Sequence, residues 1–160
     1  MTSRRLTIGA MVSVLLLTLL PATPAHAKCY RPSRSERAFV RKMNAARADE
    51  GKSRLRLDPE MSKVSKVHTR AMARKESLYH TSSAVLAKRV TNWVLLGENV
   101  GVGGTVSSLH QAFMNSAAHR ANIMLKQFKY VGVGVKKTED RMWVTVTFEA
   151  KSNPGSPLCN

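Results

Sequence analysis

The sequence predicts an α/β protein in which amphipathic helices pack against a small sheet. In the N-terminal half, apolar residues recur every three or four positions, which is typical of helices. Near the C-terminus they alternate with glycine or with other residues, which is typical of strands. An isolated pair of strands is only marginally stable in water, so these strands must lie against the helices.

Capping signals mark the starts of the first two predicted helices. The S-x-x-E spacing at 33–36 matches a capping box and predicts a helix over about 35–50, which Gly51 ends. The dipeptide Asp58-Pro59 matches an N-cap with proline at the first helical position, and predicts a second helix that ends near Ser77. The apolar positions of this second helix are Met61, Val64, Val67 and Ala71.

The remaining elements follow from shorter patterns. Three further helical segments are predicted at Val106–Asn115, Ala84–Arg89 and His119–Met124. Strands are predicted at Val131–Val135 and Met142–Phe148, with a polar hairpin connection at 138–141 and another strand around Trp93–Leu96. The glycines between Gly101 and Gly104 are expected to break any regular element, and residues 152–157 to form a loop.

The N-terminus has the features of a secretory signal peptide. Arg4 and Arg5 precede an apolar run over 6–20, and an A-x-A cleavage site ends at Ala27. The run is shorter than the ~20 residues that a helix needs to cross a bilayer, although a retained membrane anchor is the alternative. Cleavage of residues 1–27 leaves residues 28–160, a length that suits one domain.

Cysteine usage agrees with a secreted protein. Cys29 and Cys159 lie near the two ends of the predicted mature chain, and export would carry them into an oxidising compartment. We expect them to form a disulfide that joins the termini. Two free or intermolecular thiols are the competing interpretation.

The chain is strongly basic. Residues 1–27 hold two of the 26 Lys and Arg and none of the 10 acidic residues, so 24 basic and 10 acidic side chains give the mature part a net charge of +14. Such a charge favours attraction to anionic polymers or lipid surfaces, and general solubility is the simpler explanation. Few aromatic residues accompany the cations, which argues against base stacking and gives no support to sequence-specific nucleic-acid binding.

Residues able to do chemistry concentrate around His80, Glu98 and His119. Two imidazoles and a carboxylate are common ingredients of a catalytic or divalent-metal site. The sequence contains neither H-E-x-x-H nor C-x-x-C, so spacing alone indicates no metal site, and each histidine taken singly suits a packing role. We expect His68 to be a packing or rim residue and His110 to be exposed.

In combination and in this order, the motifs resemble the CAP superfamily of cysteine-rich secretory, venom antigen and pathogenesis-related proteins, in particular its small bacterial SCP-like branch. The motifs that carry the resemblance, in chain order, are Asn44-Ala45-Ala46-Arg47, Leu57-Asp58-Pro59-Glu60-Met61, Met72-Ala73, His80, Trp93, Leu96-Gly97-Glu98-Asn99-Val100, Phe113-Met114-Asn115-Ser116, His119-Arg120-Ala121-Asn122-Ile123, Val131-Gly132-Val133-Gly134-Val135 and Trp143-Val144-Thr145-Val146-Thr147-Phe148.

The resemblance implies a three-layer α-β-α sandwich with a small antiparallel sheet, and a cleft where the family gathers two histidines and two acids. His80, Glu98 and His119 match three of these four. Ser116 stands where the fuller pattern has a second glutamate, which puts strong metal binding in doubt, and Phe113 replaces a tryptophan. Asn99 and Asn122 are expected to brace loop backbone.

Three functions follow from this resemblance and from the charge. The first is a secreted, monomeric binding module for a lipid, glycan, protein or anionic wall polymer. The alternative is a metal-assisted hydrolase in which His80 and His119 ligate the ion and Glu98 ligates it or acts as a base. The third is a polyanion-binding protein with no specific cleft ligand. No cofactor is certain, and a weakly bound divalent cation such as zinc is the one these residues could accept.

We expect the secreted protein to begin at Lys28 and to carry one Cys29–Cys159 bond. Intact mass measured before and after reduction tests both expectations, because reduction adds two hydrogen atoms for each disulfide. Two free thiols in protein secreted by its own host would contradict the predicted bond.

Overall fold

The computed structural model describes residues 29–151 and 156–159. The predicted signal peptide (1–27) and most of the predicted loop at 152–157 lie outside these residues. The elements in chain order are α1 (Arg34–Asp49), β1 (Arg56–Leu57), α2 (Pro59–Lys75), α3 (Ser83–Arg89), β2 (Leu96–Gly103), α4 (Val106–Asn115), α5 (Ala117–Met124), β3 (Tyr130–Lys137) and β4 (Met142–Glu149). Among the described residues, no helix is both long enough and apolar enough to cross a membrane.

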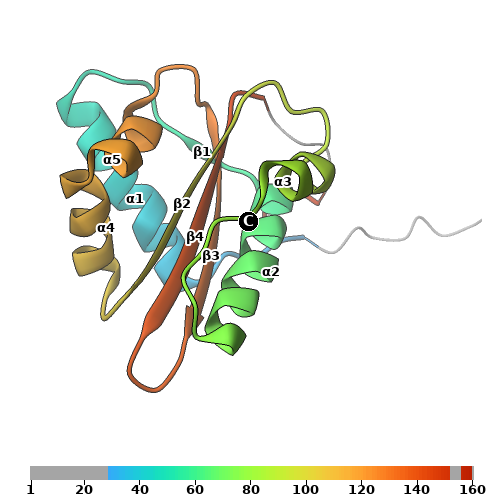
Figure 1. Cartoon of the computed structure of the whole chain (residues 1–160). Helices are drawn as coiled ribbons and strands as arrows, with labels where there is room; N and C mark the ends of the chain where they lie inside the picture. Colours follow the sequence, from blue (N-terminus) through green and yellow to red (C-terminus); the bar gives the residue numbers. More distant parts are fainter. Residues whose placement is uncertain (1–28, 152–155, 160) are drawn as a thin grey trace, which may run out of the picture.

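The predicted three-layer α-β-α sandwich is confirmed. Helices α1, α4 and α5 cover one face of the sheet, and α2 and α3 lie on the other (Figure 1). The strand order is β1-β3-β4-β2. Strands β3, β4 and β2 pair antiparallel, and the two-residue strand β1, which the sequence did not predict, adds to β3 in parallel.

The capping signals act as the sequence predicts. The Ser33 hydroxyl accepts the Glu36 N–H at 3.2 Å, and the Glu36 carboxylate accepts the Ser33 N–H at 2.8 Å, which completes the capping box of α1. At the start of α2, the Asp58 carboxylate accepts the Met61 N–H at 3.0 Å. These bonds satisfy backbone donors that have no partner within the helix.

The two faces of the sheet differ in chemistry. The face toward α1, α4 and α5 is apolar, and its buried core consists of Phe39, Met43, Leu55, Leu109, Phe113, Ile123, Met124, Phe128, Val131, Val133, Met142, Val144, Val146 and Phe148. The face toward α2 combines small and hydroxyl-bearing residues with two smaller apolar clusters, one of Met61, Leu86 and Val90 and one of Met72, Val100 and Trp143. Strand β4 is buried along its whole length, and its side chains therefore alternate between these two environments.

Helix α2 lies so close to β3 that side chains are excluded from two positions of the strand. A Cβ atom added to Gly132 would lie 2.2 Å from the backbone carbon of Met61, and one added to Gly134 would lie 2.4 Å from that of Ser65. Backbone atoms of a packed helix cannot move aside individually. The alternation of valine and glycine in β3 therefore gives a valine face to the apolar core and a flat glycine face to α2.

Hydroxyl groups join α2 to the sheet across this short distance. The side chains of Ser65 and Thr147 are hydrogen-bonded at 2.9 Å. The Thr69 hydroxyl contacts the Ser65 carbonyl at 2.8 Å and the Thr145 hydroxyl at 2.8 Å. All four side chains are fully buried. Because buried polar groups are costly unless paired, these bonds favour one register of the helix on the sheet.

The apolar pattern predicted for the second helix did not identify its buried face. Met61 is buried, but Val67 is 50% exposed, and the other residues that α2 buries are Ser62, Ser65, His68, Thr69 and Met72. The helix itself was predicted correctly because its period is right. Where α2 packs against the glycines of β3 it buries small hydroxyl-bearing residues, and Met61 and Met72 are buried in the apolar clusters on the same side of the sheet.

The strand predicted around Trp93–Leu96 was placed too early. Strand β2 begins at Leu96 and continues to Gly103, through the glycines that were expected to interrupt regular structure. A Cβ at Gly101 would lie 3.0 Å from the Phe113 ring, so this glycine allows α4 to pack closely on the strand. A glycine in a strand can mark a close approach by another element as well as an end.

Buried charges and the disulfide join distant segments. The Arg47 guanidinium is fully buried and donates to four backbone carbonyls, those of Ser53, Ile123, Leu125 and Phe128. Burial lowers the pKa of Arg47.

The predicted disulfide bond between Cys29 and Cys159 is present and joins residues 130 positions apart.

Replacing Gly134 with alanine should destabilise the fold by about 3 kcal/mol or more, because the new methyl group would overlap backbone atoms of α2. Urea unfolding measures the change. Gly104→Ala is the control, since a Cβ there meets nothing within 4 Å, and its effect should stay within about 0.5 kcal/mol. Equal stability of the two variants would contradict the close contact.

Candidate functional site

His80 is held where it is by the segment that follows α2. The helix ends at Glu76, which adopts a left-handed conformation with φ of 49°. Three residues later, the Tyr79 carbonyl accepts a 2.7 Å hydrogen bond from Nε2 of His68, and the two rings meet edge to face at 5.0 Å. His68 is 4% exposed, which confirms the predicted packing role. This buried contact anchors the residue immediately before His80.

Glu98, in strand β2, contacts His80 directly. Its side chain is only 6% exposed, and Oε1 accepts hydrogen bonds from His80 Nδ1 at 3.0 Å and from the Thr81 N–H at 2.8 Å. Glu98 Oε2 and the Thr81 hydroxyl are buried and have no hydrogen-bond partner within the described part of the chain. Two polar atoms beside an exposed imidazole are therefore available to hydrogen bond a ligand or water.

The contact with Glu98 determines the tautomer of His80. A carboxylate oxygen accepts hydrogen bonds, so Nδ1 carries the proton in this pair, and in the neutral ring Nε2 holds the lone pair. The His80 side chain is 56% exposed. Nε2 is consequently the nitrogen left to bind a ligand or to accept a proton, while Glu98 orients the ring.

His119 lies in α5, near His80. Its ring meets Phe113 at 5.0 Å between centroids, and its carbonyl accepts a 2.9 Å hydrogen bond from Asn99 Nδ2. The pKa of His119 is lowered, first because burial disfavours the charged ring and second because a positive charge on His80 opposes it. The two imidazoles thus influence each other, although 39 positions separate them in the chain.

Two asparagines connect the elements that carry Glu98 and His119. Asn122 Nδ2 donates to the Asn99 side-chain oxygen at 2.9 Å and to the Glu98 carbonyl at 3.2 Å. Asn99 is fully buried. The bracing role predicted for both asparagines is confirmed, and their bonds fix α5 against β2.

A metal ligand set made of all three residues is not preassembled. Within residues 29–151 and 156–159, no three His, Cys, Asp or Glu side chains are grouped so that they could hold a metal ion. Glu98 accepts a hydrogen bond from His80 Nδ1 and so lies in an outer position that orients His80. Outer carboxylates of this kind are common partners of metal-bound histidines.

A hollow of about 420 Å³ opens beside the His80–Glu98 pair. One end is polar and includes Thr81. The rest of the lining is mainly apolar, from Leu86, Ala87, Trp93, Val94, Leu95 and Leu96. Of these, Trp93 is 47% exposed and Val94 is 66% exposed, so large apolar side chains meet solvent next to the ionisable pair.

A buried glutamate holds this apolar segment, here called the lip (Trp93–Leu95). Glu149 is fully buried, and its Oε1 accepts the Val94 N–H at 3.1 Å and the Ala150 N–H at 3.1 Å. The Ala150 N–H also contacts the Leu95 carbonyl at 3.3 Å. The lip backbone is therefore fixed against the end of β4 before any ligand arrives.

Sequence reasoning identified His80, Glu98 and His119 but missed Thr81, the lip and Glu149. The apolar run at 93–96 was the available signal, and it was interpreted as a strand.

His110 was predicted to be exposed, but it is half-buried, and its Nε2 atom is buried without a partner among the described residues. Its pKa is lowered by burial first and by the charge of Lys42 second.

Comparisons with known proteins agree on one family. The model of the Cysteine-rich secretory protein family, CAP, matches residues 40–148. The chain is 29% identical over 106 residues to the uncharacterised protein YkwD of Bacillus subtilis (strain 168), which covers 62% of this chain and 41% of that protein. The chain therefore spans about two fifths of the length of this curated relative.

Two solved structures have a similar fold. An outer surface protein from Borrelia burgdorferi has a TM-score of 0.68 at 16% identity, covering 79% of this chain and 99% of that one. An extracellular protein containing an SCP domain from Bacillus anthracis has a TM-score of 0.63 at 23% identity, covering 73% of this chain and 40% of that one.

Replacing His80 with glutamine should raise the pKa of His119, because one of the two causes that lower it is removed while burial remains. NMR titration of the imidazole C–H signals measures the pKa of His119 in the parent protein and in the variant. His110 is the internal control, since its lowered pKa depends on burial and Lys42 rather than on His80. An unchanged His119, or an equal shift at His110, would contradict the proximity of the two site histidines.

Proposed function

Because the chain belongs to the CAP family of cysteine-rich secretory proteins, we propose that it is a secreted binding module whose cleft takes an amphiphilic extracellular ligand. The observation that carries this proposal is the composition of one hollow. The His80–Glu98 pair stands at its polar end and the exposed lip, Trp93–Leu95, forms its apolar wall.

The lip supplies binding energy. Exposed large apolar residues are ordinary when scattered, but three in succession beside a hollow are typical of a binding surface. Covering the exposed half of Trp93 alone would contribute about 2 to 3 kcal/mol. Because Glu149 already fixes the lip backbone, little conformational entropy would be lost on binding.

The polar end selects the head group of the ligand. Glu98 Oε2 and the Thr81 hydroxyl lack partners in the described structure, and an ionised carboxylate only accepts hydrogen bonds. A hydroxyl or an amine on the ligand would satisfy Glu98, and His80 Nε2 could accept a further hydrogen. The expected ligand is thus a molecule with an apolar body and a head group that donates hydrogen bonds.

Secretion is part of the proposal. It is supported by the signal-peptide pattern at 1–27, by the Cys29–Cys159 disulfide, and by similarity to an outer surface protein and an extracellular protein. Disulfides form and persist in oxidising compartments outside the cytosol.

A metal-assisted hydrolase is the alternative use of the same residues. It would need His80 and His119 as ligands, with the ion supplying an activated water. Glu98 Oε1 is already engaged by His80 and Thr81, so Glu98 suits the orientation of His80 better than the role of a base. Metal analysis of protein purified without chelator or tag, with His80→Ala as the control, tests this alternative. A stoichiometric metal lost in the variant would favour it.

We expect Trp93→Ala to weaken binding of a fluorescent monoacylglycerol by about 10-fold or more, since it removes the largest apolar side chain of the lip. Fluorescence titration gives the Kd. Val94→Ala and Val67→Ala form a matched pair, because both valines are exposed and only Val94 lines the hollow. Equal effects of these two substitutions, or none from Trp93→Ala, would contradict binding at the lip.

A further inference from the structure

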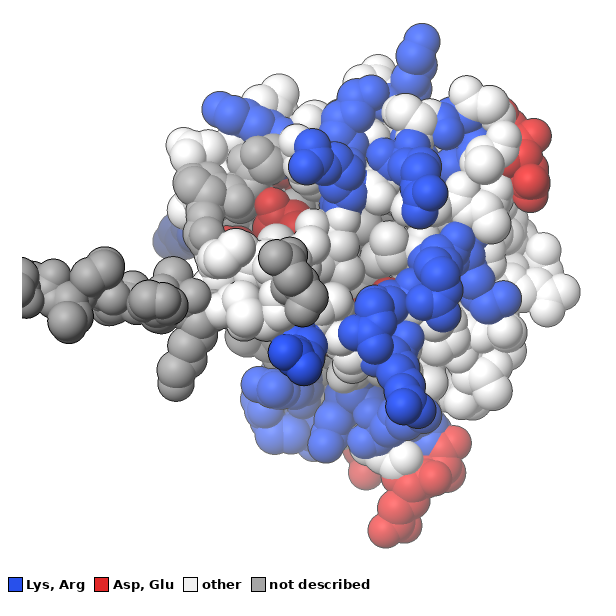
Figure 2. Space-filling model, turned by 180° about the vertical axis from the view of Figure 1, so that it is seen from behind, with Lys and Arg blue, Asp and Glu red and all other residues white. Residues whose placement is uncertain are grey.

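Basic side chains dominate one face of the molecule. Figure 2 shows the molecule from behind, where Lys and Arg cover much of the surface and few acidic side chains interrupt them. A net charge alone predicts only diffuse attraction to anions. A specific site requires cations that are unpaired, close together and arranged around a space.

Helix α2 carries five Lys and Arg residues, and four of them, spaced three or four residues apart, differ in how they are neutralised. The four are Lys63, Lys66, Arg70 and Arg74. Lys63 contacts the Glu60 carboxylate at 2.8 Å, and Lys66 contacts the buried carboxylate of Glu36 at 3.0 Å. Arg70 and Arg74 form no ion pair with any residue that the structure describes. The available positive charge on α2 is therefore concentrated at its C-terminal end.

A hollow of about 410 Å³ lies at that end. It is lined by Arg70, Ala73, Arg74, Lys136 and Thr138, so three cations surround it. Arg70 and Arg74 are four residues apart and lie on one side of the helix, while Lys136 comes from the end of β3. The close docking of α2 on Gly134 brings the strand end to the helix end. We call this site the arginine hollow.

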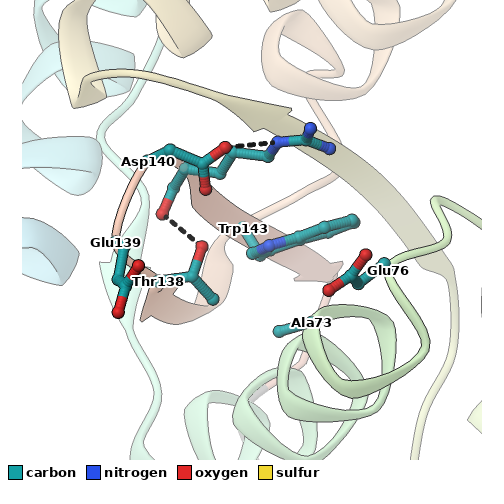
Figure 3. A pocket seen from close by; sticks show the side chains of 7 residues that line it. Ala73, Glu76, Thr138, Glu139, Asp140 and Trp143 are labelled. Atoms are coloured by element: carbon teal, nitrogen blue, oxygen red, sulfur yellow. Dashed lines mark hydrogen bonds and ion pairs between the residues drawn. The ribbon is translucent and has the colours of Figure 1, made fainter.

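The surface beside the arginine hollow carries acidic residues, which limit the directions in which a bound anionic chain can continue. A second hollow shares Ala73 and Thr138 with it and is further lined by three acids, Glu76, Glu139 and Asp140, and by Arg141 and Trp143 (Figure 3). Asp140 is turned toward Arg141, which it contacts at 3.1 Å. Glu76 and Glu139 form no ion pair with any described residue and would repel an anionic chain that continued toward the β3–β4 hairpin. Such a chain would continue away from the hairpin.

The helix dipole does not cancel the positive charge of this site. The C-terminus of a helix carries roughly half a negative charge, which opposes an anion. Arg70, Arg74 and Lys136 together carry three full positive charges around the same space. Guanidinium groups also present paired N–H donors that match the oxygens of a phosphate, and Arg is preferred where phosphate is recognised.

We propose that the arginine hollow binds a phosphate group of an extracellular phosphodiester polymer. This site is separate from the His80–Glu98 cleft and does not depend on its ligand. A polymer fits better than a membrane surface, because membrane-binding surfaces insert apolar side chains among their cations. No large apolar side chain lines the arginine hollow, and the lip residues line a different one.

The test measures binding of a fluorescent glycerol-phosphate oligomer to the full secreted chain. R70Q/R74Q/K136Q should lower affinity by at least about 10-fold. The control K88Q/R54Q/K126Q removes the same charge from exposed residues that do not line the hollow, and it should lower affinity by about 3-fold or less. With one phosphate neutralised in the hollow, affinity should fall about 3-fold between about 50 and about 200 mM salt. Circular dichroism checks that both triple variants are folded.

Two further measurements make the proposal falsifiable. A polyglutamate oligomer of equal charge should bind at least about 10-fold more weakly, because carboxylates lack the tetrahedral phosphate geometry. Phosphatidylglycerol vesicles should bind no more tightly, per exposed phosphate, than the soluble oligomer. Equal losses in the two triple variants, equal binding of both polyanions, or preferential binding of vesicles would each overturn the proposal.

Discussion

The contact of α2 with the glycine face of β3 is the constraint on which the rest of the structure depends. Gly132 and Gly134 let the helix backbone approach so closely that even a methyl group would overlap it. The hydroxyl pairs Ser65–Thr147 and Thr69–Thr145 then hold the helix in one register. Since α2 leads directly to Tyr79 and His80, its position on the sheet decides where the candidate cleft forms.

The same contact explains why the two layers of the sandwich use different chemistry. On the side of α1, α4 and α5, apolar side chains fill the space between helices and sheet, and their burial provides most of the driving force for folding. On the side of α2, side chains are excluded where the helix meets Gly132 and Gly134, although Met61, Met72 and Trp143 are buried elsewhere on that side. Paired hydroxyl groups contribute little net energy but penalise a misplaced helix, because an unpaired buried hydroxyl is costly.

The two proposed binding surfaces divide the ligand chemistry between them. The cleft combines an oriented imidazole and a buried carboxylate with the apolar lip, and the arginine hollow offers cations without large apolar neighbours. Helix α2 connects both, because the cleft follows its C-terminal residues and the hollow is built on its last turns. If both proposals hold, one molecule could bind a polymer and an amphiphile at once.

The sequence by itself determined the elements that depend on local patterns. The caps at Ser33 and Asp58, the period of the helices and the alternation in β3 and β4 are local, and the order of the motifs predicted His80 and Glu98 as one site. Tertiary structure alone decided the inner face of α2, the strand through Gly101, and the lip that Glu149 holds. The physical reason is that these features depend on the distance between packed elements, and local periodicity carries no information about that distance.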